Sequence, residues 1–267
     1  MSAFTTRSVT LGAALAIATT LAAFSPAAVL GGVFSTLAKS AANKTLARDV
    51  ERAAVGRAAA DAARASAGAA MRRQLEGLDR KTLDTIAKRY GIYMDRQRLA
   101  RAQGCRSCFL PDEAFDRALA RANPELSAAE RRQIVGYYQD QTVVNMNSRH
   151  LTRTVAHERL HQLASPAFRQ RGGAVLDEGA TEYFAARIYP GMGLPEYGPA
   201  YPESFRLFER LSARFGEERL AKAYFSGRVD ELARAVDGEL GRGAFASIAR
   251  AAEAHRFDEA MQIVRLR

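Results

Sequence analysis

Apolar residues recur at helical spacing through most of the chain. Residues 74–90 place leucine, isoleucine and alanine on one face, and similar spacing predicts helices over 203–215, 217–225, 229–236 and 244–254. The apolar positions of the first two of these later helices are expected to form the second half of the core: Phe205, Leu207, Phe208, Leu211, Phe215, Leu220, Tyr224 and Phe225.

The middle of the chain contains two further predicted helices. The first begins near Leu151, with Asn147 or Ser148 as its cap, and apolar residues on both sides indicate that it is packed inside a domain. The second follows a Gly-Gly break at Gly172, covers residues 174–188 and is expected to end at Pro190.

Residues 91–146 predict shorter elements. A helix is expected over 111–121, and the capping-box pattern of Ser127 and Glu130 predicts another that extends to about Tyr138. Residues 141–146 have the most strand-like pattern in the chain. Residues 91–94, at a glycine break, are predicted to form a second short strand. With few strands, many Ala and Arg residues and no Trp, the chain is predicted to be mostly α (α+β).

The net charge of +10 is concentrated in the N-terminal part. Residues 1–73 carry 9 basic and 3 acidic side chains, whereas the rest of the chain is only mildly basic. Basic residues do not form a stripe interleaved with aromatics, so we expect no nucleic-acid partner. The basic excess suits a membrane surface or an exposed helix.

Residues 8–38 contain no charged side chain. The apolar stretch 9–24 has signal-peptide length and is followed by small residues, yet the whole uncharged segment is also long enough to span a bilayer. We therefore predict a signal peptide or an N-terminal membrane anchor in 1–38. Either segment would direct the chain out of the cytoplasm, to the periplasm, the medium or the membrane surface. Residues 39–90 are interpreted as an Ala-rich helical stalk or linker, and 91–267 as the main folded domain.

The two cysteines, Cys105 and Cys108, form a C-x-x-C motif. Such a motif can be redox-active, half of a zinc site or a small disulfide loop. The chain offers few further ligands for a second zinc site and no preceding strand for a thioredoxin-like one. In an exported chain a structural disulfide is expected.

The chemistry of the chain centres on an H-E-x-x-H motif, His157 to His161. Residues four apart lie on one face of a helix, so both imidazoles can bind one ion. Glu158 projects close enough to take a proton from the attacking water. Zinc suits this arrangement because it accepts imidazole nitrogen and carboxylate oxygen in a compact shell. On the next predicted helix, Glu178 and Glu182 also share a face.

The motif and the L-D-E-G run ending at Gly179 resemble the gluzincin metallopeptidases, which include thermolysin, neprilysin and the zinc aminopeptidases. The resemblance implies that His157, His161 and Glu178 bind zinc. It assigns to Glu182, where the family usually has Asp, contact with the outer nitrogen of the first histidine.

The resemblance covers about a quarter of the chain and implies a minimal gluzincin domain with a small sheet against the motif helix. In gluzincins a strand near that helix pairs with extended peptide substrates. The strand at 141–146 is expected either to do so or to be an ordinary buried strand. A downstream tyrosine, Tyr201 or Tyr197, is expected to stabilise the oxyanion.

The leading hypothesis is therefore zinc-dependent hydrolysis of a peptide or protein substrate, with Glu158 as the proton acceptor. A secreted metallopeptidase toxin or effector would use the same site. A membrane-tethered helical interaction protein without catalysis is the alternative from another class.

Overall fold

The computed structural model describes residues 27–194 and 199–265, which fall into two units. The first unit, Met1–Ser66, contains the first part of helix α1, Ala27–Tyr90, and every described side chain of this unit is exposed. Among the described residues no helix is both long and apolar enough to span a membrane. Residues 1–26 of the predicted signal or anchor segment lie outside the described part.

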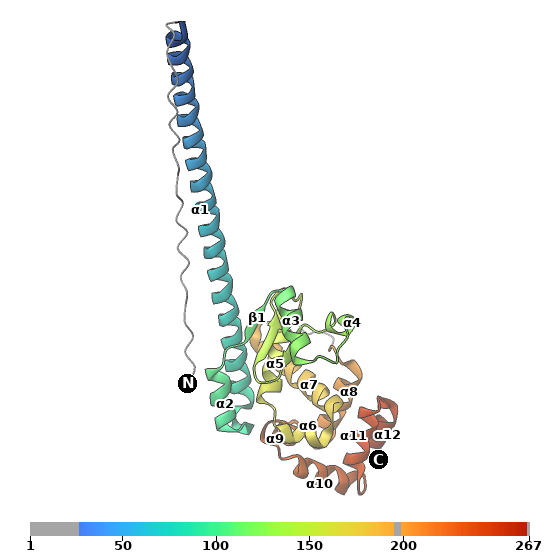
Figure 1. The fold of residues 1–267 in the computed structure, drawn as a ribbon. Helices are drawn as coiled ribbons and strands as arrows, with labels where there is room; N and C mark the ends of the chain where they lie inside the picture. Colours follow the sequence, from blue (N-terminus) through green and yellow to red (C-terminus); the bar gives the residue numbers. More distant parts are fainter. Residues whose placement is uncertain (1–26, 195–198, 266–267) are drawn as a thin grey trace, which may run out of the picture. The chain divides into compact units, whose positions relative to one another are not determined.

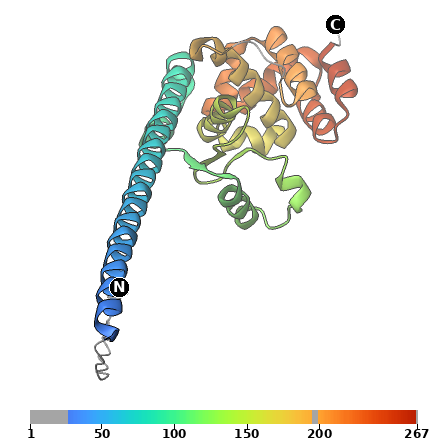
Figure 2. The ribbon, with the colours of Figure 1, turned by 90° about the horizontal axis from the view of Figure 1, so that it is seen from above.

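The second unit, Ala67–Arg267, is mostly helical, as predicted, with one small sheet (Figures 1 and 2). After α1 and a 3-10 turn, Gly91–Tyr93, its helices are α2 Arg96–Gly104, α3 Asp112–Ala122, α4 Ala128–Arg131, α5 Leu151–Leu163, α6 Pro166–Gly172, α7 Ala174–Met192, α8 Pro202–Phe215, α9 Glu217–Ser226, α10 Val229–Leu240, α11 Ala244–Glu253 and α12 Phe257–Arg265.

The start of the compact unit lies further toward the N-terminus than the predicted domain 91–267. Leu83, Ile86 and Tyr90 of α1 are buried in the main core, against aromatic residues of later helices. The predicted strand at 91–94 is wrong, because Gly91–Tyr93 forms a 3-10 turn after α1.

The sheet has the strand order β1-β3-β2, formed by Cys108–Leu110, Thr142–Asn145 and Gly136–Tyr138. β3 is central, parallel to β1 and antiparallel to β2. The strand predicted at 141–146 is therefore confirmed, but as the buried alternative, since both of its edges are paired. The strand with a free edge next to α5 is β2.

β2 replaces part of a predicted helix. The capping box at Ser127 forms as predicted, with Ser127 and Glu130 each accepting a backbone N–H from the other. The helix it begins ends at Arg131 rather than near Tyr138, because residues 136–138 pair with β3.

Helices α5 and α7 lie against each other in the core. Val155, Ala156, Leu160 and Leu163 of α5 are fully buried, as its two apolar flanks predict. Its N-cap is His150 and not Asn147 or Ser148, since Leu151 N donates to the backbone carbonyl of Ser148 instead.

Helix α7 continues past Pro190 to Met192, contrary to the prediction. Proline lacks the N–H that one helical bond requires but leaves the last turn intact, and that turn closes when Gly193 N and Leu194 N donate to backbone carbonyls. The residues of α8 and α9 that were predicted to form the second half of the core are buried, apart from the half-buried Phe205.

Candidate metal centre

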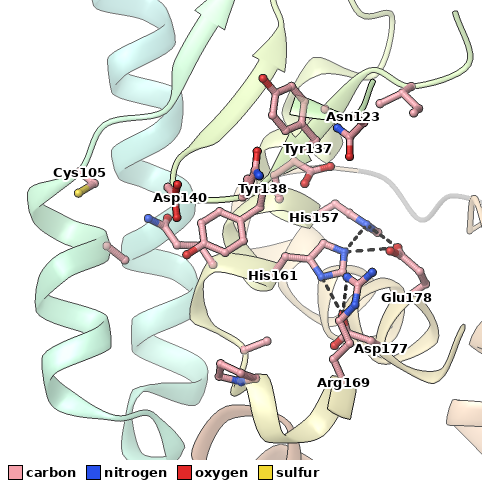
Figure 3. Close-up of a pocket in the computed structure, with 18 of the residues that line it drawn as sticks. Cys105, Asn123, Tyr137, Tyr138, Asp140, His157, His161, Arg169, Asp177 and Glu178 are labelled. Carbon is pink, nitrogen blue, oxygen red and sulfur yellow. Dashed lines mark hydrogen bonds and ion pairs between the residues drawn. The ribbon is translucent and has the colours of Figure 1, made fainter. Parts of the chain in front are cut away.

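Three side chains from α5 and α7 converge on one point (Figure 3). His157 Nε2 lies 3.0 Å from His161 Nε2 and 3.1 Å from Glu178 Oε2, and His161 Nε2 lies 3.3 Å from the same Glu178 oxygen. The helix spacing of the two histidines brings their rings to one side of α5. The core packing of α5 against α7 then brings the carboxylate to them.

The triangle formed by these atoms has the dimensions of a metal site. Zinc–ligand distances of about 2.0–2.1 Å in a tetrahedron correspond to ligand–ligand distances of about 3.3–3.4 Å. The observed sides are nearly as long, and the donor set is two imidazoles and one carboxylate. The His157, His161 and Glu178 cluster can thus hold a metal ion, as predicted.

Carboxylates contact the outer nitrogen of both imidazoles. Glu182 Oε1 lies 3.1 Å from His157 Nδ1, as predicted, and Asp177 Oδ2 lies 3.3 Å from His161 Nδ1. A carboxylate at Nδ1 fixes the orientation of the ring and leaves Nε2 facing the point that the three donor atoms share. Asp177 was not predicted, although its position beside Glu178 in the L-D-E-G run was a usable signal.

The pKa values of these groups reflect their mutual contacts. Burial lowers the pKa of His161, but hydrogen bonds to Asp177 and Glu178 outweigh it and raise the pKa to about 9. His157 also has a raised pKa, because contacts with Glu178 and Glu182 exceed the effect of burial. Burial raises the pKa of Glu178, yet the two imidazoles hold it well below its usual range.

Glu158 lies beside this cluster and is only 7 % exposed. Burial raises its pKa, and the charges of Glu178 and Glu182 add to the rise against the opposing imidazoles. Strand β2 passes so close that a Cβ atom at Gly136 would lie 3.0 Å from Glu158 Oε1 and 2.9 Å from its Cγ. Only a residue without a side chain fits there unless Glu158 moves.

Tyr201, just before α8, is the predicted tyrosine that the structure brings to the site. Its ring centroid lies 6.2 Å from that of His157, and its side chain borders the same cavities. Burial and the nearby carboxylates raise its pKa to about 12. Tyr197 lies outside the described residues.

Gly179 allows the close approach of α8 to α7 that brings Tyr201 near. A Cβ atom at Gly179 would lie 2.5 Å from the backbone oxygen of Ser204 in α8. The glycine after Glu178 is thus required by helix packing.

Two cavities meet at the site. One of about 840 Å³ extends from Glu178 toward α2, and one of about 300 Å³ lies on the other side, toward the start of α5. Gly136, His157, Glu158 and Tyr201 line both. The cluster therefore lies between two hollows along the free edge of β2, and not at the end of one.

A buried ion pair anchors α5 to the rest of the unit. The guanidinium of Arg159, fully buried within the motif, binds both carboxylate oxygens of Asp79 in α1. It also donates to the backbone oxygen of Cys105 at 2.8 Å, and Asp79 accepts bonds from the N–H and hydroxyl of Ser107. This pair cannot be read from local sequence patterns, because its partners are 80 positions apart in the chain.

Both cysteines are free thiols in the structure, so the predicted disulfide is not formed. The backbone is extended at Cys105, Ser107 is bound to Asp79, and Cys108 already pairs in β1. Disulfide geometry requires Cα atoms within about 7 Å, and this segment would have to fold back to allow it.

Comparisons of the chain with models of known families, with curated proteins and with solved structures found no match.

Proposed function

We propose that the chain is a zinc-dependent peptidase that cleaves within extended polypeptide segments. The observation that carries the proposal is the convergence of two imidazoles and one carboxylate, with a buried glutamate beside them on the same helix. His157, His161 and Glu178 would hold the zinc, since the donor types and their separations suit it.

Bound zinc would supply a Lewis acid that polarises the substrate carbonyl and lowers the pKa of water to about 7. The raised pKa of Glu158 brings it closer to the working pH, where a general base is most effective. Glu158 would take the proton of the attacking water and then deliver it to the leaving amine.

Tyr201 is the candidate for stabilising the oxyanion. With its pKa at about 12 the phenol keeps its proton at neutral pH and can donate a hydrogen bond. Its place beside His157 puts this donor at the mouth of both cavities. A donor aimed at the developing negative charge lowers the barrier more than it stabilises the bound substrate.

The free edge of β2 supports an extended substrate. Asn145 N donates to the backbone oxygen of Val135, and hydrogen-bonded pairs alternate in an antiparallel ladder. Gly136 and Tyr138 therefore direct their N–H and C=O groups to the free edge. The strand at 141–146 was expected either to pair with substrate or to be an ordinary buried strand. Because β3 lies between β1 and β2, β2 takes the substrate-pairing role in this proposal. Hollows on both sides of the cluster favour cleavage inside a chain.

The test is the Glu158→Gln variant, assayed on an unfolded protein substrate. We expect activity to fall by about a hundredfold or more, because proton transfer is lost, while metal analysis still finds zinc. Glu209→Gln, an exposed glutamate on α8, is the matched control and should keep full activity.

Two further variants test the ligands. Glu178→Ala and His157→Ala should lose zinc during purification. Full activity in Glu158→Gln, or unchanged zinc in Glu178→Ala, would count against the proposal.

A further inference from the structure

Opposite charges line the two ends of the larger cavity. The carboxylates of the metal site line one end, on α5 and α7, and Arg98 and Arg101 of α2 line the other. Figure 3 shows Cys105, which follows α2, across the cavity from Glu178. A substrate that leaves the site in this direction passes from a metal-binding region to a region of arginines.

Hydrogen bonds to other helices hold Arg98 at the second end of the cavity. Arg98 Nη1 donates to the backbone oxygens of Leu163 at 3.3 Å and Phe225 at 2.8 Å, which fixes its half-buried guanidinium at the cavity wall. Arg101 lies one turn later on α2 and forms no ion pair among the described residues.

The two guanidiniums are near enough to repel each other. Burial lowers the pKa of Arg98, and the charge of Arg101 lowers it further, against the opposing effect of Asp95. Both stay charged, because arginine does not lose its proton in proteins.

Inside the cavity little negative charge opposes these arginines, whereas Asp95, which caps α2, acts on Arg98 from outside the cavity wall. Outside the metal site, one carboxylate lines the cavity, that of the exposed Asp140 between β2 and β3. A third arginine, Arg169 of α6, lies at the rim beside the site, with its guanidinium 3.6 Å from Asp177 and largely exposed (Figure 3). Because Arg169 is paired with Asp177 of the site, the rest of the cavity wall has two cations, Arg98 and Arg101, and one anion, Asp140.

We infer that this cavity binds an acidic side chain of the polypeptide, on one side of the cleaved bond. The inference rests on the proposed peptidase function and names the substrate preference of the same site. An acidic residue would pair with Arg98 and Arg101, and a basic residue would meet like charges.

The experiment uses the full-length zinc-loaded protein and matched fluorogenic peptides. The peptides carry Glu, Gln or Lys at each of the three positions on either side of the cleaved bond. We expect Glu to exceed Gln by about fivefold in kcat/KM, on one side only, as partly exposed ion pairs allow. The preference should shrink at high salt, because screening weakens exposed pairs.

Variants that remove a positive or a negative charge from the cavity wall test the inference directly. Arg101→Gln should reduce the preference for Glu, Asp140→Asn should increase it, and Arg210→Gln, an exposed arginine of α8 that does not line the cavity, should leave it unchanged. Binding to the zinc-loaded Glu158→Gln variant, measured by fluorescence anisotropy, should show the same order of affinities without any turnover.

The outcomes separate the two proposals. Cleavage with no charge preference, or with Lys preferred over Glu, overturns the inference and leaves the peptidase intact. Absence of both cleavage and binding for every peptide overturns the proposed function and the inference with it.

Discussion

At the scale of single residues, the site depends on which atom each side chain presents. Glu182 and Asp177 contact the Nδ1 atoms, so both imidazoles present Nε2 to the same point. The Glu182 side chain is long enough to reach its histidine from the next helix. The same carboxylates favour the protonated imidazole when no metal is bound, so protons and metal compete.

This competition predicts the pH dependence of metal binding. The pKa of His161 rises from its ordinary value of 6.5 to about 9, so its protonation stabilises the metal-free fold fully below about pH 6.5. That contribution is lost as pH rises through about 9, where zinc no longer has to displace the proton. Buffered zinc should therefore raise the melting temperature more at pH 9 than at pH 6, measured by differential scanning fluorimetry.

His255→Gln serves as the control for the pH series, because this exposed histidine is not part of the cluster and should leave the trend unchanged. A zinc-induced shift that is equal at both pH values would show that these imidazoles do not bind the ion.

At the scale of elements, the position of β2 decides how Glu158 is enclosed. The strand lies against α5, and its glycine contacts both Glu158 and Thr154. A Cβ atom at position 136 would also lie 2.5 Å from Thr154 Cγ2. A side chain at this position would therefore force α5 or β2 to shift. Local sequence favoured helix here, and pairing with β3 overrode it.

Gly136→Ala should therefore impair catalysis without loss of zinc. The added methyl group would clash with Thr154 and with Glu158, so both side chains, or β2 itself, must shift. Misplacement of a catalytic group by about 1 Å can cost a hundredfold in rate. The measurement is kcat together with zinc content. Gly77→Ala is the matched control, since nothing lies within 4 Å of a Cβ there and helical Ala is favoured. Unchanged kcat in Gly136→Ala would refute the steric argument.

At the scale of the whole second unit, one ion pair connects distant segments of the chain to α5. Arg159 and Asp79 are 80 positions apart, and both are buried. The pair also binds the segment at Cys105–Ser107, so it joins α1, the end of α2 and α5. A buried pair is worth little over a well-packed apolar substitute, but the loss of one partner leaves an uncompensated charge.

Asp79→Ala should lower the free energy of unfolding by about 3–5 kcal/mol, because Arg159 would remain buried without its counter-ion. Denaturant titration of the metal-free protein measures this. Asp84→Ala removes an exposed carboxylate from the same helix and should change stability by less than about 0.5 kcal/mol. Equal stability of the two variants would show that the pair is not an anchor.

The sequence by itself determined what depends on neighbours along the chain. The spacing of His157 and His161 places both rings on one face of a helix, the spacing of Glu178 and Glu182 does the same on α7, and the box at Ser127 begins α4. These features follow from helix geometry and from hydrogen bonds across three or four residues, so a single sequence contains them.

The tertiary structure alone decided what depends on contacts across long separations. It made β2 the free edge, brought Asp79 to Arg159, set Asp177 against His161 and included the end of α1 in the core. Each outcome results from packing or pairing between segments whose local patterns are compatible with several partners. For this reason the residues of the candidate metal cluster could be predicted from the sequence, whereas the walls of the cavity around them could not.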